Sequence, residues 1–201
     1  MSAHLRQCAS VWRVTAEWLA VGALSLSLGM ALPAAGDSGG SPGANDASRE
    51  YEIKAAFIYN FTKFVEWPPR SLQGASDPIV IAVLGDSPCA QALEQVTRGR
   101  LVNGHPILVK RVDSAKDAGT AHLLFVGSSQ EGQFARMAPA LAAAPVLTVG
   151  ESPSFAAEGA ISFVRQEDKV RFEINLNAAT KAGLKISAQL LKLATAVRGS
   201  G

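Results

Sequence analysis

Apolar positions in the first strongly patterned segment of the chain recur at helical spacing. They follow the i, i+3, i+4, i+7, i+8 rule of an amphipathic helix at Phe57, Ile58, Phe61, Phe64 and Val65. We predict a helix that Ser48 caps and that ends before Pro68. Phe57, Phe61 and Phe64 are expected to face the core, while Lys54, on the same stripe, is expected to reach past the core edge to water.

Short apolar, β-branched runs alternate with helical segments further along. Strands are predicted at Pro78–Gly85, His105–Val112, Ala121–Gly127 and Pro145–Glu151, and helices at Ser87–Thr97 and Glu131–Ala144. This alternation indicates a mostly parallel sheet with right-handed crossovers.

The end of the chain has a different pattern. Gly159–Leu176 contains two alternating runs around Glu167 and Asp168, which predicts a β-hairpin with one buried and one wet face. Asn177–Val197 is predicted to be helical, with an interruption near Gly183. The fold class is therefore α/β, with a mostly parallel central sheet of about five to six strands flanked by helices, a C-terminal β-hairpin and a helical end.

The N-terminus has the pattern of an export signal. Arg6 and Arg13 precede an uncharged run from Trp18 to Gly36 that closes on small residues. We expect residues 1–36 to be a signal peptide cleaved between Ala34 and Gly36; the alternative is an uncleaved membrane anchor. Residues 37–47 are expected to form a flexible linker, and residues 48–197 a single domain.

Composition excludes little except nucleic-acid binding. The 201 residues are 48% hydrophobic and 18% charged, with a formal net charge of +2, so no basic footprint is present. Cys8 would leave with the signal peptide, so Cys89 is expected to be unpaired. Such a thiol is either buried and inert or available for an intermolecular bond.

Catalytic and metal-binding patterns are weak. The Leu84–Pro88 stretch "LGDSP" resembles the opening block of GDSL-type hydrolases, but the histidine block that such a serine needs near the C-terminus is missing. Helix capping is the simpler interpretation of Ser87. His105 and His122 have no zinc or haem spacing and are expected at the rim. We therefore predict no enzyme activity, cofactor or metal site.

One polar constellation remains, on the predicted wet face of the final hairpin. It comprises Arg165, Arg171, Glu173 and Asn175, followed by Lys181 and Lys185. This is either an ordinary solvated strand face or a shallow anion, small-ligand or partner site in which arginine geometry matters.

Several segments together resemble one family. They are "YEIKAAFIYNFTKFVEWP" (51–68), "IAVLGDSPC" (81–89), "PVLTVGESPSFAAEGAISFV" (145–164) and "VRFEINLNAATKAGLKISAQLLKLA" (170–194). In this order they are similar to the YfiR/HmsC-type periplasmic proteins. The resemblance implies a small α/β domain that binds the periplasmic sensor part of an inner-membrane diguanylate cyclase and represses it, lowering cyclic-di-GMP and biofilm formation.

The same resemblance implies further properties. Members tend to dimerise and use disulfides in redox control; Cys89 matches a family cysteine, but Ala121 stands at the position of its partner, so only a Cys89–Cys89 homodimer link stays open. Trp67 with Pro68 is a candidate partner-contact corner, and Arg171, Glu173 and Asn175 are candidate ligand positions. The alternative function is a stand-alone periplasmic small-ligand sensor. No direct membrane insertion is expected after signal cleavage.

Overall fold

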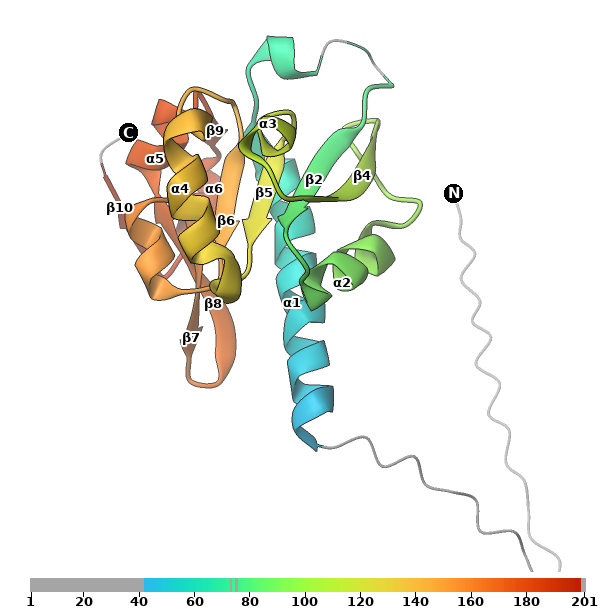
Figure 1. The fold of residues 1–201 in the computed structure, drawn as a ribbon, viewed down its shortest axis with the longest axis vertical. Helices are drawn as coiled ribbons and strands as arrows, with labels where there is room; N and C mark the ends of the chain where they lie inside the picture. Colours follow the sequence, from blue (N-terminus) through green and yellow to red (C-terminus); the bar gives the residue numbers. More distant parts are fainter. Residues whose placement is uncertain (1–41, 73, 75, 200–201) are drawn as a thin grey trace, which may run out of the picture. The chain divides into compact units, whose positions relative to one another are not determined.

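A mixed sheet of eight strands organises the fold (Figure 1). The structure is a computed structural model that describes residues 42–72, 74 and 76–199. The strand order is β10-β8-β7-β6-β5-β2-β4-β3. The strands are β2 (Ile79–Leu84), β3 (Leu101–Val102), β4 (His105–Val112), β5 (Leu123–Val126), β6 (Leu147–Gly150), β7 (Ile161–Gln166), β8 (Lys169–Asn175) and β10 (Ala196–Arg198).

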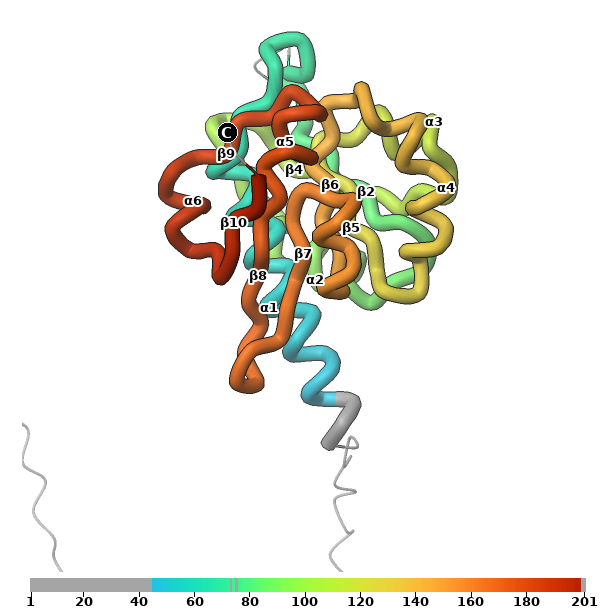
Figure 2. Tube along the Cα trace, turned by 90° about the vertical axis from the view of Figure 1, so that its left-hand side faces the viewer, coloured from blue at the N-terminus to red at the C-terminus, as the bar shows by residue number. Residues whose placement is uncertain are grey.

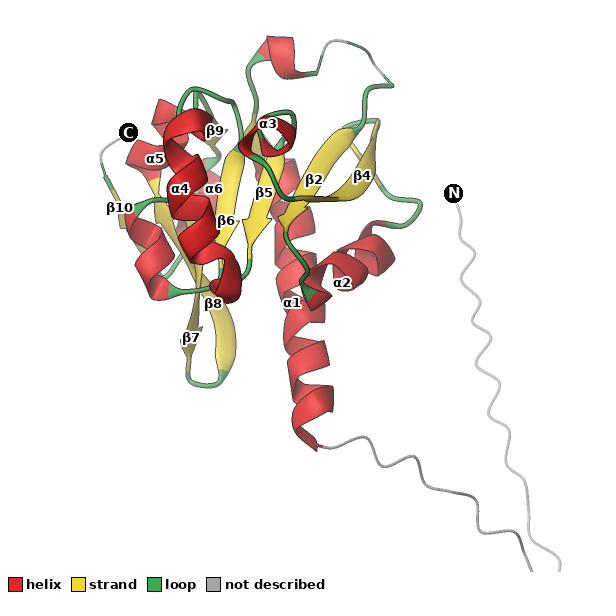
Figure 3. Ribbon diagram, in the orientation of Figure 1, coloured by secondary structure: helices red, strands yellow, loops and turns green. Residues whose placement is uncertain are grey.

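Helices cover both faces of this sheet (Figure 3). One face packs against α1 (Pro42–Phe64) and α2 (Pro88–Thr97), the other against α4 (Glu131–Leu141) and the short α3 (Ala115–Ala118). Alternation along the strands separates the two cores. In β2, for example, Ile81 and Val83 belong to the first core, whereas Ala82 and Leu84 belong to the second.

The α/β class is confirmed, and the sheet is larger and more mixed than predicted. Strands β2, β4, β5, β6 and β7 are joined by parallel pairings, as expected for βαβ units. The β7–β8 hairpin joins this sheet as an antiparallel extension, and β3 adds a short antiparallel edge at β4.

The prediction of a helical C-terminus is wrong in part. Two six-residue helices, α5 (Leu176–Lys181) and α6 (Ala188–Leu193), are separated by β9 (Lys185–Ile186). Gly183 adopts a φ of 73° after α5, which L side chains disfavour, and turns the chain into β9. Strand β9 pairs antiparallel with β1 (Val65–Glu66), and β10 pairs parallel with β8.

Helix α1 begins earlier than its sequence pattern predicts. It starts at Pro42, so Ser48 lies inside the helix and does not cap it, and the predicted linker overlaps its first turns. The predicted signal peptide lies outside the described residues. Within residues 42–199, as far as they are described, no helix is long and apolar enough to cross a bilayer.

The β7–β8 hairpin and the first turns of α1 extend beyond the sheet on the same side (Figures 1 and 2). Strand β7 pairs with β6 only as far as Ser162, and its last four residues continue past the end of β6. As predicted, Glu167 and Asp168 form the turn, with φ values of 49° and 57°.

Aromatic packing joins α1 to this hairpin at its base. The ring centroids of Phe61 and Phe172 lie 5.0 Å apart, and those of Phe57 and Phe163 lie 6.1 Å apart. Phe61 is fully buried, whereas Phe57 and Phe64 are only partly buried against the same core. The predicted core face of the helix is therefore confirmed.

The remaining described elements are short. They are the 3₁₀ turns η1 (Pro69–Ser71), η2 (Ser128–Gln130) and η3 (Pro153–Ala157). η2 and η3 lie in the loops that follow β5 and β6, close to the carboxyl ends of these strands.

Candidate functional site

A groove of about 780 Å³ runs between the first turns of α1 and the projecting hairpin. We call it the hairpin groove; its lining is Asp46, Ala47, Arg49, Glu50, Ile53, Phe57, Arg165, Asp168, Lys169, Val170 and Arg171. The helix residues recur every three or four positions and so form one stripe of α1. Ile53 contributes an apolar side chain that is 40% exposed.

A buried ion cluster anchors the helix wall of this groove. Lys54 Nζ lies 2.7 Å from Glu50 Oε1 and 2.9 Å from Glu151 Oε1, and the Glu151 side chain is only 6% exposed. The second oxygen of Glu151 accepts a hydrogen bond from the Ser128 N–H at 3.0 Å. The cluster thereby connects α1 to the carboxyl ends of β5 and β6.

The electrostatics of the cluster favour a charged Lys54. Burial opposes its charge, but the hydrogen bonds to Glu50 and Glu151 outweigh burial and raise the pKa of the ammonium. The same ammonium lies 5.1 Å from the centre of the Tyr51 ring, whose own pKa is raised by burial and by the charge of Glu151. The prediction that Lys54 reaches out to water is therefore wrong: it points inward to partners.

Glu50 also links the cluster to the hairpin. Its Oε2 lies 3.6 Å from an Arg165 guanidinium nitrogen, and Arg165 also lies 3.4 Å from the Asp168 carboxylate. Both contacts of Arg165 are largely solvent-exposed, so each contributes little alone. Together they place the Arg165 side chain at the groove, which it lines.

The strand register separates the predicted polar constellation. Arg165 pairs with Val170, and Phe163 pairs with Phe172, so Arg165 shares the face that packs on α1. Arg171 alternates to the opposite face. The prediction that Arg165 lies on one wet face with Arg171, Glu173 and Asn175 is therefore wrong, because Arg165 is two residues from the buried Phe163 and so shares its face of β7.

Glu173 and Asn175 already have partners within the fold. Glu173 Oε2 lies 2.8 Å from the Arg198 guanidinium on β10. Asn175 caps α5 by accepting the Ala178 N–H at 3.2 Å and donates to the Ala156 carbonyl at 3.0 Å. Asn175 also lines a second pocket of about 640 Å³ between α4 and α5.

Trp67 also has a partner within the fold, and its side chain is partly buried. Its indole N–H donates to the His122 carbonyl at 3.0 Å, and the two rings meet edge to face at 5.9 Å. The prediction that His122 is a rim residue is wrong, since it is 8% exposed. Its Nδ1 accepts the Val80 N–H, which makes Nε2 the donor to the Ser71 carbonyl. A partner role for Trp67 stays a prediction.

Ser87 has a structural role in the described fold. It is 6% exposed, and its hydroxyl accepts the Cys89 N–H at the start of α2. Ser87 follows the carboxyl end of β2, whereas His105 and His122 lie at the amino ends of the parallel strands β4 and β5. The serine and the two histidines are therefore at opposite ends of these strands. The predicted N-cap is confirmed.

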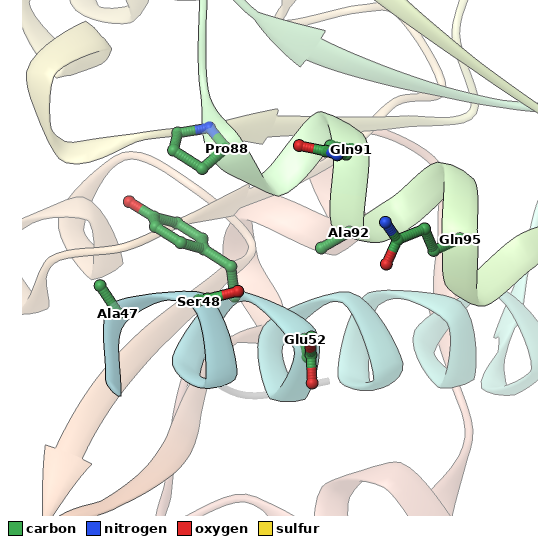
Figure 4. Close-up of a pocket in the computed structure, with 8 residues that line it drawn as sticks. Ala47, Ser48, Glu52, Pro88, Gln91, Ala92 and Gln95 are labelled. Carbon is green, nitrogen blue, oxygen red and sulfur yellow. The ribbon is translucent and has the colours of Figure 1, made fainter. Parts of the chain in front are cut away.

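Cys89 is fully buried and unpaired. Burial raises the pKa of its thiol to about 12, with a further contribution from the charge of Glu151. A groove of about 330 Å³ between α1 and α2 passes close by and is lined by Pro88 and Ala92 but not by Cys89 (Figure 4). An intermolecular disulfide would therefore need α2 to open first.

The pair of glutamates around Lys54 was missed from sequence, although a signal was present. A lysine on an apolar helical stripe needs either an exit to water or a buried counter-charge. Nothing local identifies Glu151 as that counter-charge, because it lies 97 positions away. Within the described residues, no group of three or more His, Cys, Asp or Glu side chains could hold a metal ion.

Comparison with known proteins identifies one family. The sequence model of the family described as YfiR/HmsC-like matches residues 51–195. No curated protein matches the chain.

Two solved structures are similar in fold. A conserved domain protein from Vibrio cholerae O1 biovar El Tor aligns with a TM-score of 0.51 at 13% identity, covering 74% of this chain and 60% of that one. The ABC domain of Streptococcus pneumoniae in complex with L-Trp aligns with a TM-score of 0.43 at 13% identity, covering 76% and 60%. The chain thus spans about three fifths of each, and the first likeness bears on the fold alone.

Proposed function

We propose, because this chain belongs to the YfiR/HmsC-like family of periplasmic regulators of diguanylate cyclases, that it is exported to the periplasm and represses an inner-membrane diguanylate cyclase by binding its periplasmic sensor part. Repression lowers cyclic-di-GMP and with it biofilm formation. The observation that carries the proposal is the family match over residues 51–195, which begins within α1 and ends at the residue before β10.

The hairpin groove is the surface to which we assign the cyclase. It combines an exposed apolar residue, Ile53, with a rim of charges, as partner-binding surfaces do. Of the candidate residues predicted from sequence, Arg165 and Arg171 line it. We assign no catalytic step, since Ser87 serves as a helix cap.

Deleting the gene tests the regulatory role. Loss of a repressor should raise cellular cyclic-di-GMP, and expression of the intact chain should restore the original level. Lys169→Glu, in the groove, should restore it poorly, whereas Lys192→Glu, an exposed lysine of α6 outside the groove, should restore it fully. An unchanged cyclic-di-GMP level in the deletion strain would refute the proposal.

A second candidate function is a stand-alone periplasmic ligand sensor. The pocket between α4 and α5 favours it, because its volume of about 640 Å³ is in the usual range for small-molecule sites. A metabolite that binds only the native state raises the melting temperature. A thermal-shift screen with Asn177→Ala as a pocket variant would therefore separate this candidate from cyclase binding.

A further inference from the structure

The projecting hairpin has an unpaired outer edge on β8. Strand β10 pairs with β8 only at Glu173, Ile174 and Asn175. The more N-terminal part of β8, from Lys169 to Arg171, pairs with β7 on one side and has no strand on the other side in the described part of the chain. An unpaired strand edge presents backbone N–H and C=O groups that another strand can satisfy.

The hairpin turn fixes which backbone groups point outward. A two-residue turn in which both residues have positive φ is closed by a hydrogen-bonded pair, here Gln166 and Lys169. Pairs alternate along an antiparallel ladder, so the next pair, Arg165 and Val170, is not hydrogen-bonded. The N–H and C=O of Val170 therefore point away from β7. The same alternation places the Phe172 carbonyl outward, where it accepts the Thr195 N–H at 2.9 Å.

The hairpin groove lies along this free edge. Three consecutive residues of β8, Lys169 to Arg171, line it, whereas β7 contributes only Arg165. The opposite wall is the α1 stripe that carries Ile53 and Phe57. A groove between a helix and a free strand edge is the geometry in which proteins bind an extended segment by β-augmentation.

We propose that the bound segment of the partner is an extended strand that pairs with Val170 and fills the hairpin groove. Its identity as part of the cyclase rests on the proposed function; its strand conformation rests on the edge and the groove. Alternate side chains of such a strand would face Ile53 and Phe57, and the others would face the side of Lys169 and Arg171.

The charged side chains that line the groove favour a strand of the partner over a second copy of the chain. Among the described residues, Arg49, Lys169 and Arg171 have no ion-pair partner, and neither does Asp46, whereas Glu50 and Asp168 are engaged by Arg165. The groove therefore has more unpaired cations than unpaired carboxylates. Two antiparallel β8 edges would bring Lys169 and Arg171 against the same cations of the other copy, which is unfavourable. The groove therefore fits a strand that alternates apolar and acidic residues.

The first arm of the test uses a defined probe. A fluorescent, end-capped hexapeptide that alternates valine and glutamate should bind the full chain and slow hydrogen exchange of the Val170 amide. The same peptide with N-methylated backbone amides should bind at least about tenfold more weakly, since it cannot complete the ladder. Absence of binding up to about 1 mM, or binding without protection of Val170, would overturn the proposal.

The second arm uses the detergent-solubilised diguanylate cyclase and edge variants. Val170→Pro removes the outward N–H without removing a β7 bond, and Ile53→Glu places a charge in the groove. Each should weaken capture by about tenfold or more, whereas Leu108→Glu, at a site 50% exposed on β4, should not. Ile53→Glu on the helix surface keeps the test valid should Val170→Pro misfold.

The two proposals fail differently. If the wild-type chain captures no cyclase, the proposed function fails, and the peptide arm still decides whether β8 accepts a strand. If the wild-type chain captures the cyclase and both variants bind within about twofold of it, the strand proposal is overturned and the proposed function stands.

Discussion

Removing the Lys54 ammonium tests the buried ion cluster most directly. Lys54→Met keeps most of the side-chain stem, so core packing is retained, but it leaves the Glu151 carboxylate, 6% exposed, with only the Ser128 N–H. Breaking a buried pair by removing one partner costs about 3–5 kcal/mol, because the remaining charge stays desolvated. With a urea dependence of about 2 kcal/mol/M, the unfolding midpoint should fall by about 2 M.

The assay is urea unfolding followed by far-UV circular dichroism, with two further variants. In Lys54→Met combined with Glu151→Gln, no buried charge is left alone, so at least about half of the lost free energy of unfolding should return. Lys192→Met, at an exposed lysine, should change it by less than about 0.5 kcal/mol. A loss below about 1 kcal/mol in Lys54→Met, or a double variant no more stable than Lys54→Met, would refute the assigned role of the cluster.

Three further predictions concern buried groups. Burial lowers the pKa of His122, with His105 and Asp77 as the nearby titratable groups, so the unfolded chain binds the proton first as pH falls below about 6.5. As pH falls, the free energy of unfolding should then fall by at most about 1.4 kcal/mol per pH unit. His122→Gln, but not His105→Gln, should flatten this dependence. Equal pH slopes in His122→Gln and the wild-type chain would contradict the assignment. The Cys89 thiol, with a pKa of about 12, should react with a disulfide reagent at pH 8 only after urea unfolding, so prompt reaction of the native chain would show that α2 opens readily. Ser87→Ala should reduce the free energy of unfolding by about 1 kcal/mol through loss of the α2 cap, and Ser129→Ala at an exposed hydroxyl serves as its comparison.

Local patterns predicted most of the sheet and its helices. Neighbouring residues encode the β2 and β4 strands, the Ser87 cap and the Glu167–Asp168 turn. The structure has each of them where the sequence predicts it. The early start of α1 was missed because Pro42–Ser48 is rich in small and polar residues with weak helix propensity. Strand β10 was missed because three residues carry little pattern, and its partner β8 lies more than 20 positions away.

The candidate site was predicted less well than the fold. Sequence identified Arg165 and Arg171 as polar residues of a hairpin, but only the register shows that they lie on opposite faces. Glu173 and Asn175 have the chemistry of ligand-binding residues, and the structure shows both engaged with Arg198 and the start of α5. The groove itself depends on how far a hairpin projects beyond its sheet, which no short stretch of sequence encodes.

The ion cluster and the groove are parts of one arrangement. The first turns of α1 lie beyond the sheet, and in the described structure Glu50 and Lys54 connect this part of the helix to β7 and to the end of β6. A charged cluster in so buried a place contributes less to stability than an apolar one of the same shape would, so stability alone does not account for it. Its contacts instead link the α1 wall of the hairpin groove, which carries Ile53, to the hairpin through Arg165 of β7. A groove whose walls are held apart before binding loses less conformational entropy when a strand enters, and affinity rises accordingly.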